Sequence, residues 1–92
     1  MNEADRQGRI EELRRAELAK AIVENPLWSE LWAQLDERLM SGWKSSVTGQ
    51  SDVREMIYLQ MRAAESVRAE MESILMTGTM ARLQLERSED GR

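Results

Sequence analysis

The sequence contains no cysteine, no histidine and no phenylalanine, and it has one proline among its 92 residues. Without cysteine, disulfides and thiolate metal sites are excluded. Without histidine, nearly all zinc chemistry and the Ser-His and Cys-His catalytic pairs are excluded as well. We therefore expect a protein that is not an enzyme and that holds no metal or cofactor. A chain without disulfides suits a reducing compartment, so we expect it in the cytoplasm.

Long apolar runs and blocks of one charge sign are also missing. Each apolar run is only a few residues long, whereas a membrane span needs about 20. The start of the chain, Met1 to Asp5, has no basic segment leading into an apolar one, so it does not predict a secretory signal. The formal net charge is −4, with acids and bases interleaved. This distribution favours neither a membrane nor a nucleic-acid surface as the partner.

The residues that are present predict helices. Ala, Leu, Met, Glu, Arg and Gln are strong helix formers, and they dominate the sequence. A chain of this length forms one domain at most, and its core alone supplies only a few kcal/mol, so small domains of this kind need tight helix packing or oligomerisation.

The helical periodicity predicts three main helices at about 10–24, 26–43 and 52–76, within a helical domain spanning residues 10–78. Residues 1–9 are expected to form a flexible tail, and 79–92 a short helix with a polar tail. The apolar residues of 10–24 fall on several sides, which predicts either a helix covered by several neighbours or one that is only marginally stable. Asn25 and Pro26 predict a cap and a new helix start, although one kinked helix is the alternative.

The helix over 26–43 has one apolar stripe, formed by Trp28, Leu31, Trp32, Leu35, Leu39 and Trp43. Gly42 lies within it and has two interpretations: a close approach to a neighbour, or the left-handed residue that ends the helix, which we favour.

The helix over 52–76 begins with Asp52 and Glu55 at capping-box spacing, with Ser51 as an alternative cap. Its stripe contains a heptad line: Val53, Ile57, Gln60, Ala64, Val67, Met71 and Ile74. Gln60 is the one polar residue on that line, and Gly78 is expected to end the helix in the left-handed conformation.

These patterns predict an all-α fold: an antiparallel helical hairpin with an additional N-terminal helix, forming either a small bundle or an oligomer. Leu35 and Val67, near the centres of their stripes, are expected to be buried between the two helices of the hairpin.

Apolar residues that one hairpin cannot cover form a candidate interaction patch. It consists of Trp28, Trp32, Trp43, Tyr58, Leu59 and Met61. Tryptophan is enriched at binding hot spots, but in a chain without phenylalanine we favour the interpretation that the three tryptophans form the core of the hairpin. Both interpretations hold if the patch is larger than one helix can cover. The carboxylates lie on polar faces, which is typical of solvated helix surfaces rather than of a metal site.

The segments Asn25-Pro26-Leu27-Trp28, Trp43-Lys44-Ser45-Ser46, Asp52 to Tyr58, and Met76-Thr77-Gly78-Thr79-Met80-Ala81 resemble small helical proteins of tailed phages and prophages. The resemblance covers roughly residues 18–81 and implies a viral assembly or accessory role, in the host cytoplasm or the virion. It assigns no functional residue.

We therefore expect a structural or protein-interaction module that self-associates or binds another helical protein. The alternative is a small nucleic-acid-binding or DNA-packaging accessory protein. Its only candidate contacts are Arg6, Arg9, Arg14 and Arg15, which are interleaved with glutamates at helical neighbour spacing.

Overall fold

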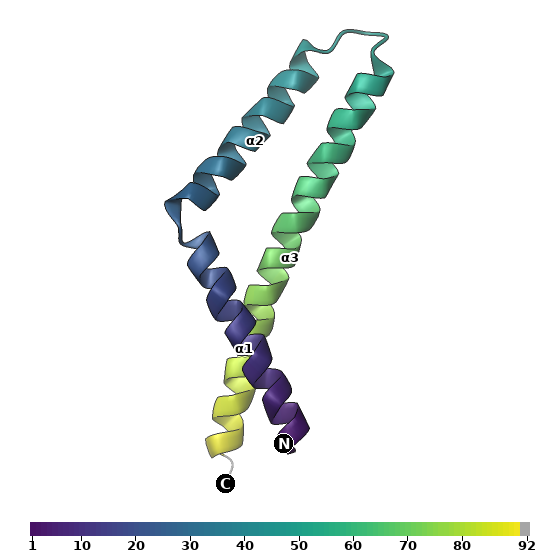
Figure 1. Ribbon diagram of the computed structural model, residues 1–92. Helices are drawn as coiled ribbons and strands as arrows, with labels where there is room; N and C mark the ends of the chain where they lie inside the picture. Colours follow the sequence, from purple (N-terminus) through teal and green to yellow (C-terminus); the bar gives the residue numbers. More distant parts are fainter. Residues whose placement is uncertain (91–92) are drawn as a thin grey trace. The chain divides into compact units, whose positions relative to one another are not determined.

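The computed structural model describes residues 1–90, and this part of the chain is all-α (Figure 1). Helix α1 spans Glu3–Val23, α2 spans Pro26–Ser45 and α3 spans Ser51–Asp90. Helices α2 and α3 form an antiparallel hairpin, since Ser46 contacts Arg54 and Asp36 contacts Arg68. The predicted fold class, with a hairpin and an additional N-terminal helix, is confirmed.

Helix α1 begins much earlier than the apolar pattern indicated. The side chain of Asn2 accepts a hydrogen bond from the Asp5 N–H at 2.8 Å, and Glu3 and Asp5 place negative charge in the first turn. A capped and acidic first turn stabilises a helix without any apolar stripe. The prediction of a flexible tail over 1–9 was therefore wrong for residues 3–9.

The break between α1 and α2 falls where the sequence predicted it. Asn25 caps α2 by accepting a hydrogen bond from the Leu27 N–H at 2.9 Å, and Pro26 is the first helical residue. Helix α2 then continues to Ser45, two residues beyond the predicted end. Gly42 is helical, and a Cβ on it would lie 3.3 Å from Ile57 Cδ1. Its role is the close approach, so the interpretation as a helix end was wrong.

The connection between α2 and α3 contains the one described residue with a positive φ. Gly49 has a φ of 99°, a conformation that favours glycine. Around it, Gln50 N–H donates to Val47 O at 3.0 Å, and the Gln50 side chain accepts from Val47 N–H at 2.9 Å. Ser51 and Asp52 lie inside the first turn of α3, so the predicted capping by either residue was wrong.

Helix α3 is 40 residues long and does not end near Gly78. The predicted short final helix is continuous with it up to Asp90, and the last residues of the predicted polar tail, 91–92, lie outside the described part. Gly78 is buried, and an added Cβ would overlap Ala16 Cβ and lie 3.5 Å from Ala16 Cα. Glycine at 78 therefore lets α1 approach α3 closely, and the predicted left-handed helix end was wrong.

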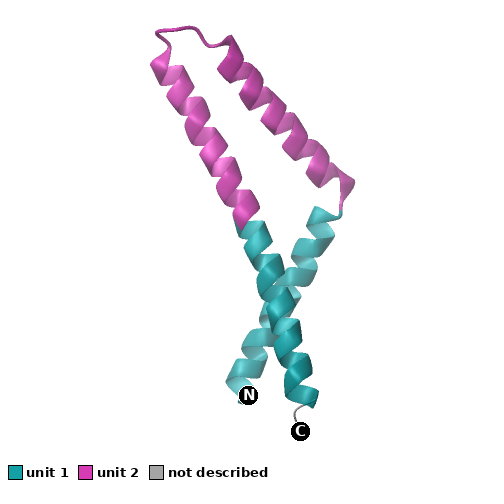
Figure 2. Cartoon of the chain, turned by 180° about the vertical axis from the view of Figure 1, so that it is seen from behind, with its two compact units in different colours: residues 1–24, 70–92 teal, residues 25–69 magenta. Residues whose placement is uncertain are grey.

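The chain divides into two compact units that share α3 (Figure 2). Unit 1 contains α1 and the part of α3 from Glu70 onward, and its buried apolar residues are Ala19 and Ala81. Unit 2 contains α2 and the part of α3 up to Ala69, and its buried apolar residues are Leu39 and Ala64. Both cores are small.

The contact between α2 and α3 is centred on Leu39 and Ala64 rather than on the predicted pair. Leu35 is half-buried, and Val67 is 52% exposed, so the predicted burial of Val67 was wrong. Three residues along a helix correspond to a rotation of about 60°, which turns Val67 from the face of Ala64 towards solvent.

Candidate interaction surface

Two of the predicted patch residues, Trp28 and Trp32, lie one turn apart on α2 and contact each other. Their ring centroids are 5.3 Å apart with an interplanar angle of 76°, an edge-to-face arrangement. Both rings are half-buried. Such a pair is one of the preferred aromatic geometries and leaves part of each ring in contact with solvent.

Arg68 on α3 fixes Trp32 from the opposite helix. Its guanidinium carbon lies 4.6 Å from the Trp32 ring centroid, and its two terminal nitrogens donate to the Asp36 carboxylate at 3.0 and 3.1 Å. This hydrogen bonding to Arg68 lowers the pKa of Asp36 and raises that of Arg68. Through Arg68, these contacts link α3 to two residues of α2, Trp32 and Asp36.

Trp43 lies at the other end of α2 and has its own arginine. The Arg54 guanidinium carbon is 4.7 Å from its ring centroid, and Arg54 Nε donates to Ser46 Oγ at 2.7 Å. Trp43 is separated from Trp32 by about 16 Å along the axis, given the rise of 1.5 Å per residue. The three tryptophans therefore do not form one patch.

The remaining patch residues point in different directions. Tyr58 and Leu59 are exposed on α3, whereas Met61 is half-buried facing α2. Met61 lines a shallow hollow of about 200 Å³ with Asp36, Leu39, Met40, Glu65 and Arg68. The six predicted residues thus belong to at least three separate parts of the hairpin surface.

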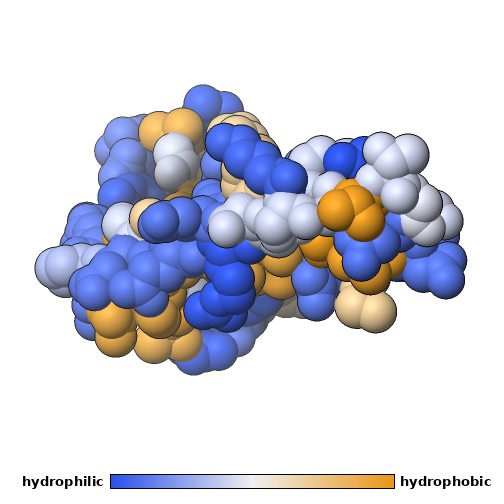
Figure 3. All heavy atoms as spheres, turned by 90° about the horizontal axis from the view of Figure 1, so that it is seen from above, coloured by the Kyte–Doolittle hydropathy of each residue, from blue (hydrophilic) through white to orange (hydrophobic). Residues whose placement is uncertain are grey.

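A larger groove runs along the side of the hairpin towards which Val67 is turned. It has a volume of about 380 Å³ and is lined by Trp32, Leu35, Arg38, Leu39, Gln60, Ala63, Ala64 and Val67. We call Val53, Met56, Gln60, Ala63 and Val67, which lie along this side of α3, the seam. All five are exposed, Met56 to 62%. In the space-filling view, hydrophobic residues (orange) reach the surface among hydrophilic ones (blue) (Figure 3).

The sequence contained a partial signal for the seam. Val53, Gln60 and Val67 were on the predicted heptad line, but so were Ile57 and Ala64, which face α2 instead. The contacts of Arg54 with Trp43 and of Arg68 with Trp32 could not be predicted from the sequence, because an arginine side chain is long enough to reach several residues of the opposite helix.

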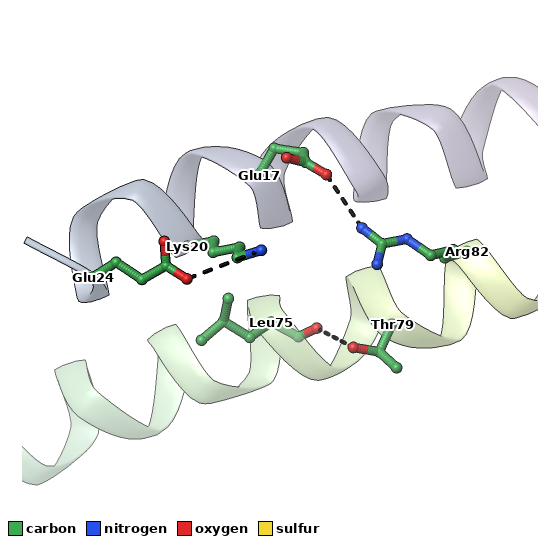
Figure 4. Close-up of polar contacts among 6 residues, drawn as sticks. All are labelled: Glu17, Lys20, Glu24, Leu75, Thr79 and Arg82. Atoms are coloured by element: carbon green, nitrogen blue, oxygen red, sulfur yellow. Dashed lines mark hydrogen bonds and ion pairs between the residues drawn. The ribbon is translucent and has the colours of Figure 1, made fainter.

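Ion pairs occupy several arginines of unit 1. Arg82 donates to Glu17 at 3.2 Å between α3 and α1, while Lys20 pairs at 3.9 Å with Glu24, the residue that caps the end of α1 (Figure 4). The same view shows Thr79 Oγ1 donating to Leu75 O at 3.2 Å, which keeps its hydroxyl bonded within α3.

Two of the four arginines considered as nucleic-acid contacts are also paired. Arg9 pairs with Glu12 and donates to Gln84 at 3.1 Å. Arg14 donates to Glu11 at 2.6 and 2.9 Å, and this bonding lowers the pKa of Glu11. Paired guanidinium groups are less available to phosphates.

Within residues 1–90, no three carboxylates gather in an arrangement that could hold a metal ion. No helix in this range is long and apolar enough to cross a bilayer. Comparisons of the chain with protein families, with curated proteins and with solved structures find no match.

Proposed function

We propose that this protein is a non-enzymatic structural or protein-interaction module that self-associates. The observation that carries the proposal is the amount of surface that the single chain leaves exposed. The resemblance to small phage proteins suggests particle assembly as the setting, whereas the exposed surface supports self-association in any setting.

The accessible surface of the chain is 7208 Å². A folded monomer of 10.6 kDa is expected to expose about 5,500 Å², so the chain exposes roughly 1,700 Å² more. A standard protein interface buries about 800 Å² on each partner, and obligate homodimers bury more. The excess is therefore of the size that an obligate dimer removes from solvent.

The identity of the exposed residues supports the same proposal. Within residues 1–90, the buried apolar residues are three alanines and one leucine. Large apolar residues are instead exposed on all three helices: Ile10, Leu18, Ile22, Leu27, Leu31, Met40, Val53, Met56, Tyr58, Leu59, Val67, Met76, Met80 and Leu83. Single exposed apolar residues are ordinary, but many of them beside so small a core favour burial against a partner.

Thermal unfolding at a series of protein concentrations tests the proposal. A self-associating protein melts at a higher temperature as its concentration rises, because association stabilises only the folded state. We expect this rise between micromolar and millimolar chain. A melting temperature independent of concentration would contradict self-association.

An electrophoretic shift assay on random duplex DNA tests the alternative function. A protein that contacts phosphates binds such DNA at low salt and releases it as salt increases. We expect no shift at low salt. A salt-dependent shift together with a concentration-independent melt would favour the nucleic-acid-binding alternative.

A further inference from the structure

We propose that the seam is the self-association surface and that its occupant is α3 of a second copy, aligned parallel to the first. The inference rests on the proposed function and adds to it the contact residues and the direction of the partner helix.

The spacing of the seam fits a helical occupant. Val53, Gln60 and Val67 are seven residues apart, and Met56 and Ala63 follow the first two of them by three residues. These are the a and d positions of a heptad repeat, which brings two helices together along one line. All of the seam residues lie on α3 and are exposed, so α3 of a second copy would present the same residues to this surface.

The residue types on the seam favour a parallel pair. In parallel coiled coils, β-branched residues at a positions favour a pair of helices over larger assemblies. Valine fills two of the three a positions, and Met56 and Ala63 fill the d positions. A polar residue at one a position fixes the register between the two helices. Gln60 occupies the central a position and is exposed in the single chain.

The chain's own helices are engaged elsewhere. Helix α2 packs beside Ile57 and Ala64, about 60° or more around α3 from Val67. In unit 1, α1 contacts the other half of α3. There Ala81, which continues the heptad line seven residues after Ile74, is 1% exposed. The heptad line thus has a helical neighbour in unit 1, while the described helices leave the seam in unit 2 uncovered.

The surroundings of the seam extend the apolar contact. Leu59 precedes Gln60 and is 59% exposed, and Leu35 on α2 lines the adjoining groove. In a parallel pair related by a two-fold axis along α3, each copy's α3 lies beside the groove of the other copy. Among the described residues that line the groove, Arg38 alone is charged, so the surface offers a partner mainly apolar contacts.

Cysteine cross-linking tests the contact cleanly, because the natural chain has no cysteine. The variants Val53→Cys and Gln60→Cys are oxidised separately. A disulfide requires Cα atoms within about 7 Å, so it reports only residues that meet. We expect both variants to form disulfide-linked dimers of doubled mass. Tyr58→Cys is the matched control, since Tyr58 is also exposed but lies about 160° around the helix from Gln60.

The outcomes separate the inference from the proposed function. Cross-linking of Gln60→Cys without Val53→Cys would show an antiparallel pair and overturn the parallel arrangement. An oligomeric chain in which only Tyr58→Cys cross-links would place the interface on another face and overturn the seam, while self-association would stand. A monomeric chain that cross-links at none of the three would overturn both.

A second pair of variants avoids any dependence on disulfide geometry. Val67→Glu introduces a charge into the seam, whereas Tyr58→Glu introduces the same charge on the opposite face. We expect the first to halve the solution mass at micromolar concentration and the second to leave it unchanged. Circular dichroism of both confirms that the helices are retained. An unchanged mass for Val67→Glu with retained helicity would contradict the seam.

Discussion

Replacing Gly78 with alanine should destabilise the protein, although alanine is the better helix former. In an exposed helix interior, glycine to alanine stabilises by about 0.8–1.0 kcal/mol. At Gly78, however, the new methyl group would overlap Ala16 Cβ and lie 3.6 Å from Glu12 O. Ordinary carbon contacts lie at about 3.5–4.0 Å, and neither methyl group has a rotamer that could relieve the overlap.

The steric term is therefore expected to exceed the gain in helix propensity. Overpacking a close contact costs about 1–3 kcal/mol, and two rigid groups favour the upper half of that range. The net loss for Gly78→Ala is then about 1–2 kcal/mol, which lowers the melting temperature by roughly 5–15 °C for a domain of this size. Thermal denaturation followed by circular dichroism at one fixed chain concentration measures it.

Two further variants isolate the contact. Gly8→Ala is the matched control, because nothing lies within 4 Å of the added Cβ, and it should stabilise by about 0.8–1.0 kcal/mol. The double variant Ala16→Gly with Gly78→Ala moves the methyl group from one helix to the other and should restore stability to near that of the natural chain. If Gly78→Ala stabilised as much as Gly8→Ala, the close approach of α1 to α3 at this residue would be refuted.

Three other perturbations follow from the structure. Leu39→Ala should cost about 2–5 kcal/mol in urea denaturation, because Leu39 is the one large apolar residue that is buried in the described part of the chain. The exposed control Met40→Ala should stay within about 0.5 kcal/mol, and equal effects of the two variants would contradict the hairpin packing. Asn25→Ala removes the cap of α2 and should lower the unfolding free energy by about 0.5–2 kcal/mol, and no loss would argue against the cap. The lowered pKa of Asp36 stabilises the fold above its ordinary value of 3.8 and ceases to do so as pH falls through the folded-state pKa. Melting curves of the natural chain and Asp36→Asn should therefore differ at neutral pH and converge in acid; a difference that persists in acid would contradict this.

Local signals in the sequence predicted the features that depend on local chemistry. The start of α2 follows from Asn25 and Pro26, whose preferences act within a single turn. The helical hairpin follows from apolar periodicity, which the burial of Leu39 and Ala64 confirms. These features needed no knowledge of the neighbours of each helix.

Features set by contacts between helices could not be predicted in this way. Gly42 and Gly78 were expected to end helices, but both permit a close approach instead, towards Ile57 and Ala16. A glycine signals both roles identically until the neighbouring helix is known. Likewise, the heptad line of α3 was wide enough for two neighbours, and periodicity alone did not separate the side facing α2 from the seam.

The most direct test of self-association is the mass of the natural chain in solution, measured by light scattering coupled to gel filtration. The exposed surface and the uncovered seam predict a particle of twice the 10.6 kDa chain mass at micromolar concentration and above. A mass of one chain that persists up to millimolar concentration would contradict the proposed function and leave the seam as ordinary solvent-exposed surface.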